Sequence, residues 1–100
     1  MEIIRELDKD GRITLNSDLI ELCGIVKKSK VAICKIDKKK LAIRNLENIK
    51  GYKVIACMTM DEKGRVIIPQ EIRKEKKKFE IYYLDGSLIL EEAHWFVCFF

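Results

Sequence analysis

The 100-residue sequence contains one histidine and one proline, and its four cysteines include no Cys-x-x-Cys pair. The cysteines stand at positions 23, 34, 57 and 98, so no spacing typical of a zinc site occurs. We therefore expect reduced thiols, mostly buried as small apolar side chains, in a cytosolic protein. Neither a cofactor nor a metal site is predicted.

Long apolar runs and catalytic groupings are also missing. No stretch approaches the roughly 18 apolar residues that a membrane-spanning helix needs. The charged start MEIIRELDKD lacks the apolar segment of a signal peptide. His94 has no nucleophile arranged beside it in the sequence, and no glycine-rich phosphate loop occurs. We expect neither an enzyme nor a membrane protein.

Charge is unevenly divided along the chain. The formal net charge is +4, and its excess lies in residues 1–50, since residues 51–100 hold equal numbers of acidic and basic side chains. This excess favours an anionic partner only weakly, because a solvated basic surface explains it equally well.

One phrase occurs twice. Residues 7–15 read LDKDGRITL and residues 60–68 read MDEKGRVII. A short helix is predicted after each copy, in NSDLIE from 16 and PQEIRK from 69, followed by a β-hairpin in 30–46 and in 78–92. With a lead strand before each phrase, each copy is predicted to form strand, glycine turn, strand, helix and hairpin.

The repeat predicts the domain organisation. We expect a first repeat in residues 1–50, a second in 51–92 and an aromatic tail in 93–100. Neither repeat has enough strands to bury both of its faces alone. The two are therefore predicted to close over each other as a mostly β, pseudo-twofold barrel or sandwich with interleaved strands.

The motif Asp-x-x-Gly-Arg, the three β-forming residues after it, the Pro and Glu-Ile-Arg of the second copy, and an acidic hairpin turn together resemble the swapped-hairpin DNA-binding superfamily of AbrB, SpoVT and MazE. Two copies in one chain are similar to the tandem MraZ family. The resemblance covers roughly residues 3–92. It implies a swapped-hairpin double-split β-barrel with short helices, formed by two tandem repeats.

Within the phrase, the residue types suggest how an arginine is held. A glycine allows a positive φ, and an aspartate can accept hydrogen bonds from loop amides, so that the next arginine stands at a strand start. A fixed guanidinium can bond guanine or phosphate, or merely close the turn with its own aspartate. The loop-positioning candidates are Asp8, Gly11, Asp61 and Gly64.

The resemblance implies which residues contact double-stranded DNA: Arg5, Arg12, Arg65, Arg73 and Lys74. Met58 replaces the equivalent of Arg5 in the second copy, so we predict asymmetric contact. The expected function is a cytoplasmic, nucleoid-associated transcriptional regulator that occludes promoter DNA, with homo-oligomers expected. The alternatives are an antitoxin-like or scaffold module that binds a protein partner through residues 94–100, and a degenerate copy that binds no DNA.

Overall fold

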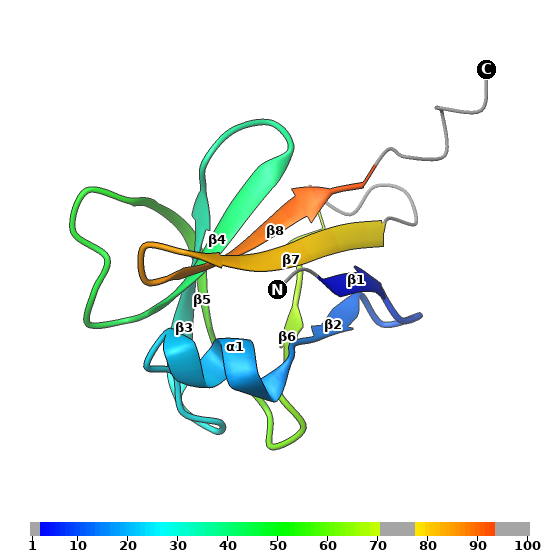
Figure 1. Ribbon diagram of the computed structural model, residues 1–100, viewed down its shortest axis with the longest axis horizontal. Coiled ribbons are helices and arrows are strands. Elements are labelled where there is room, and N and C mark those ends of the chain that lie inside the picture. The colour runs from blue at the N-terminus through cyan, green and yellow to red at the C-terminus, as the bar shows by residue number, and fades with distance from the viewer. Residues whose placement is uncertain (1–2, 71–77, 94–100) are drawn as a thin grey trace.

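The computed structural model describes residues 3–70 and 78–93 and is mostly β, as predicted (Figure 1). Its elements are β1 (Ile3–Glu6), β2 (Arg12–Thr14), α1 (Ser17–Leu22), β3 (Lys30–Lys35), β4 (Lys40–Asn45), β5 (Lys53–Thr59), β6 (Arg65–Ile67), β7 (Lys78–Leu84) and β8 (Ser87–Glu92). Within the described residues, no helix is long and apolar enough to cross a membrane.

The strands form one large antiparallel sheet and one small ribbon. The six-stranded sheet has the order β1-β7-β8-β4-β3-β5, and the two-stranded ribbon pairs β2 with β6. The lead strand of each half pairs with the hairpin of the other half, because β1 lies on β7 and β5 lies on β3. When each strand is replaced by its counterpart in the other half, the same strand order results, read from the opposite edge of the sheet. This is what a pseudo-twofold axis between β4 and β8 requires.

The predicted closed barrel is not formed. Among the described strands, β1 and β5 are the two edges of the six-stranded sheet and do not pair with each other. The short strands β2 and β6 bond to one another. The sheet is therefore open, with the ribbon packed against one of its faces.

The main core lies between the sheet and the ribbon with α1. Alternate sheet residues, such as Ile33 in β3 and Ile43 in β4, face this side, as the period of two in a strand requires. Ile13 of β2 and Val66 of β6 contact the same cluster, and α1 adds Leu19. Figure 1 shows α1, β2 and β6 gathered on one side of β7. The repeated phrase therefore supplies core residues as well as turns.

A second, smaller core covers the opposite face of the sheet. It contains Ala32, Cys34, Ala42 and Ile89, with partly buried side chains from the connection between β4 and β5 packed on it. That connection includes Ile49 and Tyr52. The segment that joins the two repeats is thus part of the fold, which the sequence pattern did not indicate.

Local signals at helix and turn were predicted well. Asn16 caps α1 by accepting hydrogen bonds from two backbone amides, and Gly24 follows the helix with a φ of +70°. The β7–β8 turn places Asp85 and Gly86 at φ of +49° and +81°, as a type I′ turn requires. The second predicted helix falls largely on residues 71–77, which lie outside the described residues.

The described thiols are free and only partly follow the expectation of burial. Cys23 and Cys34 are buried, but Cys57 is exposed on edge strand β5. Burial raises the pKa of Cys23 to about 11. Cys98 lies outside the described residues.

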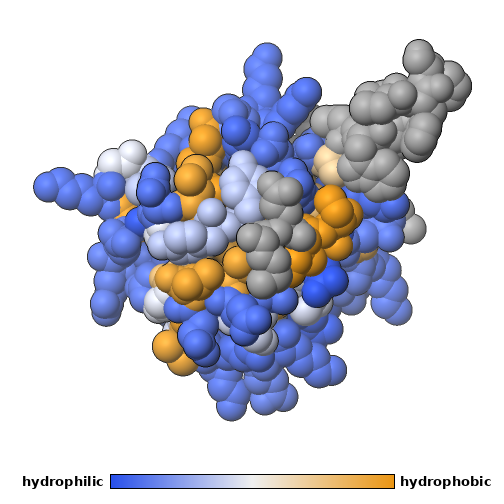
Figure 2. All heavy atoms as spheres, viewed as in Figure 1, coloured by the Kyte–Doolittle hydropathy of each residue, from blue (hydrophilic) through white to orange (hydrophobic). Residues whose placement is uncertain are grey.

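Hydrophobic side chains reach the surface in small groups between hydrophilic ones, as Figure 2 shows for one face. The exposed large apolar side chains are Ile4, Leu22, Val26, Ile36, Ile67, Tyr83 and Leu84. They come from several different elements. One of them, Ile67, belongs to the ribbon that carries the repeated phrase.

Candidate nucleic-acid interface

The ribbon presents both arginines of the repeated phrase on one outward face. Its central pair, Ile13 and Val66, is buried against the main core. Neighbouring residues of a strand point to the opposite side, and directly paired residues share a side. The outward side chains, which we call the arginine face, are therefore Arg12, Thr14, Arg65 and Ile67.

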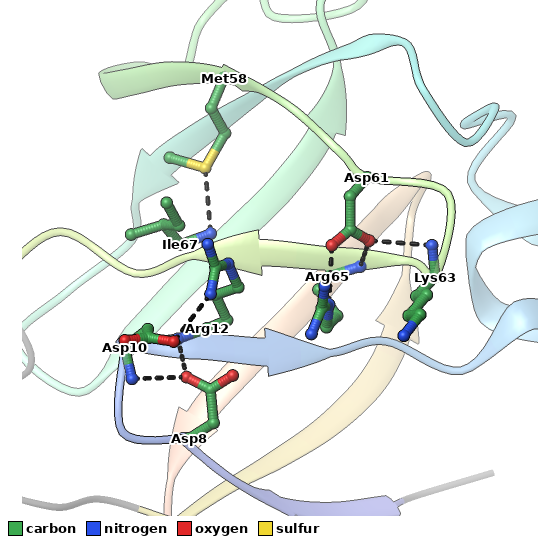
Figure 3. Close-up of polar contacts among 8 residues, drawn as sticks. All are labelled: Asp8, Asp10, Arg12, Met58, Asp61, Lys63, Arg65 and Ile67. Carbon is green, nitrogen blue, oxygen red and sulfur yellow. Dashed lines mark hydrogen bonds and ion pairs between the residues drawn. The ribbon is translucent and has the colours of Figure 1, made fainter.

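The two glycine turns that lead into the ribbon have the same geometry. Asp8 Oδ1 accepts hydrogen bonds from the amides of Asp10 and Arg12 at 2.9 and 2.8 Å. Asp61 Oδ1 accepts from the amides of Lys63 and Arg65 at 2.9 and 2.8 Å (Figure 3). In both copies the aspartate fixes the start of the arginine strand, as the residue types predict.

The glycines connect the halves as well as turning the chain. Gly11 and Gly64 have φ of +80° and +78°. The carbonyl of Gly64 accepts from the amide of Leu15, and that of Gly11 accepts from Ile68, each at 2.9 Å. These two bonds are exchanged by the pseudo-twofold axis, so each turn extends the ribbon of the other copy.

The arginine side chains are held differently in the two copies. Arg65 Nε bonds Asp61 Oδ2 at 2.7 Å, whereas Arg12 Nη1 bonds Asp10 Oδ2 at 3.0 Å. The difference follows from position 10, which is acidic, while the equivalent position 63 is lysine. The side chains of Arg12 and Arg65 are 36% and 32% exposed, so both reach solvent.

The field at this face is not strongly positive. Residues 8–12 contain two acidic and two basic side chains, and residues 61–65 contain the same balance. Lys28 and Glu62, both exposed, form a further loose ion pair at 3.9 Å. Specific placement of guanidinium groups, rather than bulk charge, is therefore what this surface can offer an anionic partner.

The other predicted contact residues are not brought onto the arginine face. Arg5 lies on β1 opposite Phe79, half-buried on the core side of the sheet, and its Nε is enclosed without a hydrogen-bond partner among the described residues. Its counterpart Met58 lies beside the ribbon and accepts a bond from the Ile67 amide at 3.3 Å (Figure 3). Arg73 and Lys74 lie outside the described residues.

Sequence reasoning missed Thr14 and Ile67 as outward neighbours of the arginines. The alternation of the predicted strands contained that signal, because both are two positions from an arginine.

Comparison with family models, curated protein sequences and solved structures gave no match to this chain.

The turn aspartates predict an acid dependence of stability. The amide hydrogen bond from Arg12 lowers the pKa of Asp8, and that from Arg65, helped by its guanidinium, lowers the pKa of Asp61. A carboxyl with a lowered folded-state pKa stabilises the fold above its unfolded pKa, and this contribution is lost as pH falls through the folded-state value.

We therefore expect Asp61→Asn to reduce the dependence of the free energy of unfolding on pH on the acid side of neutrality. Urea unfolding between pH 6 and pH 2 measures this. Glu62→Gln is the control, because Glu62 lies in the same turn but accepts no amide hydrogen bond from the part of the chain that the structure describes, and it should keep the parent slope. An identical slope for Asp61→Asn and the parent would show that the turn carboxylate does not couple to folding.

Proposed function

We propose that the chain is a DNA-binding protein in which the arginine face contacts the major groove. The observation that carries this proposal is the placement of Arg12 and Arg65 on one outward face of a two-stranded ribbon. A β-ribbon fits the width of the major groove, where an arginine can bond O6 and N7 of guanine. The two arginines are diagonal neighbours, so both can contact one short site.

The way Arg65 is held supports base reading. Its Nε is occupied by Asp61, and among the described residues its terminal nitrogens have no hydrogen-bond partner. A guanidinium oriented through Nε keeps the forked end available for a planar, two-acceptor partner. Arg12 uses Nη1 to bond Asp10, so in this proposal it must release that bond to contact a base through both terminal nitrogens.

The face is not symmetric in chemistry. Ile67 stands opposite Arg12, and Thr14 stands opposite Arg65. Apolar side chains and threonine methyl groups pack on the thymine methyl, and a threonine hydroxyl can also bond a base edge. We therefore infer that the two halves read unlike half-sites. Arg5 is half-buried on the core side of the sheet and is not part of this face, whereas Arg73 and Lys74 stay predicted contacts outside the described residues.

The proposal includes membership of the swapped-hairpin superfamily, in its tandem form. The exchange of β1 and β5 between the two halves supports this. The same proposal has three further parts: transcriptional regulation by promoter occlusion, assembly into homo-oligomers and a location on the nucleoid. The alternative of a protein-binding module depends on residues 94–100, which lie outside the described residues.

A binding assay with duplex DNA tests the arginine face. A site is first selected from random duplexes with the parent protein, and affinity is then followed by fluorescence anisotropy across a salt series. Arg12→Ala combined with Arg65→Ala should weaken binding at least about tenfold, since each forked contact contributes about 1–3 kcal/mol. The salt slope should also flatten, by up to about two ion equivalents.

Lys35→Ala combined with Lys53→Ala is the matched control. Both lysines are exposed and opposite each other in the six-stranded sheet, so this variant removes the same charge away from the ribbon. If the two double variants lose affinity equally, binding follows net charge and the proposed reading face is wrong. Failure to select any site would exclude sequence-specific binding.

A further inference from the structure

A buried arginine without an acidic partner lies on the sheet face opposite the ribbon. Arg44 of β4 is 4% exposed. Ala42, two positions before it, belongs to the smaller core, which places Arg44 on the same face. The ion pairs of the described residues do not include Arg44. Its charge is therefore enclosed without a carboxylate, an arrangement that is unfavourable unless something compensates it.

Neutral groups accept hydrogen bonds from two of the three guanidinium nitrogens. Nε donates to the carbonyl of Asn48 at 2.6 Å, and Nη1 donates to the Tyr52 hydroxyl at 2.9 Å and the Asp85 carbonyl at 3.2 Å. Nη1 also donates to Ser87 Oγ. The Tyr52 ring lies against the guanidinium, with its centroid 4.2 Å from Cζ. Within the described residues, Nη2 has no hydrogen-bond acceptor.

The unbonded Nη2 faces a place where a second donor converges. A Cβ placed on Gly86 would lie 3.3 Å from Arg44 Nη2 and 3.8 Å from Asn48 Nδ2. Gly86 has no side chain, so the turn leaves this space to the two N–H groups. Asn48 and Asp85 are exposed, which opens the place to solvent. In Figure 1 the β7–β8 turn and the connection after β4 lie on the same side of the molecule.

We propose that Arg44 Nη2 and Asn48 Nδ2 bind a small tetrahedral oxyanion of the phosphate class at the β7–β8 turn. Such an ion supplies the acceptors that Nη2 lacks and the negative charge that Arg44 lacks. Glu47 and Lys50 are both exposed in the same connection and balance each other, so the positive charge at the site is that of Arg44. The site is on the opposite face from the arginine face and does not depend on DNA binding.

Asp85 carries a negative charge in the turn at which the ion is proposed to bind. Its backbone carbonyl already accepts from Nη1, and its carboxylate is the acidic group of the same turn. The carboxylate makes no ion pair with Arg44 among the described residues, but a negative charge in the turn disfavours an approaching anion. Removal of the Asp85 carboxylate should therefore strengthen binding of the ion. If Arg44 had only a structural role and bound no ion, this replacement would change no phosphate affinity.

Isothermal titration of the full chain with inorganic phosphate tests the site, with sodium chloride at equal ionic strength as the reference. We expect saturable binding and a higher melting temperature in phosphate than in chloride. Asn48→Ala should weaken phosphate binding about tenfold or more, because a hydrogen bond to a charged group is lost while the carbonyl that holds Nε remains. Asp85→Asn should strengthen it several-fold, and asparagine accepts the positive φ at this position.

Lys35→Ala combined with Lys53→Ala should bind phosphate as the parent does. Three results overturn the proposal: equal melting temperatures in phosphate and chloride, unchanged affinity in Asn48→Ala, or loss of binding in the lysine variant. The last two place any bound ion elsewhere. Asn48 and Asp85 are exposed surface residues, so these variants are expected to fold and the result does not depend on replacing Arg44 itself.

Discussion

Arg44→Ala is expected to lower the free energy of unfolding by about 3–4 kcal/mol, the largest effect predicted for a single replacement in this chain. Hydrogen bonds to a charged group contribute about 1.5–3 kcal/mol each, and acceptors left unsatisfied in the interior add to the loss. The change leaves the carbonyls of Asn48 and Asp85 and the Tyr52 hydroxyl without their donor. Removal of a buried charge without an acidic partner works in the opposite direction and limits the loss.

Urea unfolding in chloride buffer, free of phosphate and sulfate, measures this difference without the proposed ligand. Arg12→Ala is the matched control, because its guanidinium is partly exposed and forms a surface ion pair, which contributes about 1 kcal/mol or less. Arg44→Lys should be intermediate, since an ammonium keeps the charge but loses the planar fork. Equal losses for Arg44→Ala and Arg12→Ala would show that the contacts across the β7–β8 turn do not hold the halves together.

Ile13→Ala is expected to lower the free energy of unfolding by about 3 kcal/mol. Ile13 is fully buried beneath the ribbon, and a large-to-small change in a core costs about 2–5 kcal/mol from lost burial and the cavity left behind. The cavity would lie between the ribbon and the six-stranded sheet, where Ile13 is paired with Val66. Thermal or urea unfolding of the purified variant provides the measurement.

The same replacement at Ile67 is the control for the ribbon. Ile67 is 43% exposed on the arginine face, so Ile67→Ala should cost less than about 1 kcal/mol. Under the proposed function it should also alter DNA affinity while stability is nearly kept. If Ile67→Ala destabilises as strongly as Ile13→Ala, the outward face of the ribbon is covered by other protein and is unavailable to DNA.

The parts of the fold that sequence could predict are those fixed by neighbouring residues. Asp8 and Gly11 determine a turn within five positions, Asn16 caps the helix that starts beside it, and Asp85 with Gly86 forms a two-residue hairpin turn. Each of these depends on local hydrogen bonds and backbone preference. The second copy of the phrase then indicated that two such units share one core.

Features that depend on distant pairing could not be predicted in this way. In the sequence Arg44 is one basic residue in a hairpin, and its role appears only when the fold brings Asp85 and Ser87 to it, 41 and 43 positions away. The open sheet has the same origin. Whether the short strands close a barrel depends on their register with the edges, which hydrophobic alternation does not specify.

The candidate site was predicted in part. The repeated Asp and Gly positions indicated two arginines at strand starts, and the structure places both on one face of the ribbon. The pairing of Arg12 with Asp10 instead of Asp8 was not foreseen, although it follows from the acidic residue at position 10, where the second copy has Lys63. Arg5 lies on the adjoining sheet, since its position two residues after Ile3, which is partly buried against the main core, turns it inward.

The pairing of β1 with β7 has a consequence for synthesis of the chain on the ribosome. Strand β1 finds its partner only after residues 78–84 have emerged, so the amino-terminal half waits with an unpaired edge and exposed apolar side chains. Contacts between such distant segments also slow folding, because a long loop must close before they form. The nascent amino-terminal half is therefore the species most in need of chaperone protection, although the finished domain buries the same residues.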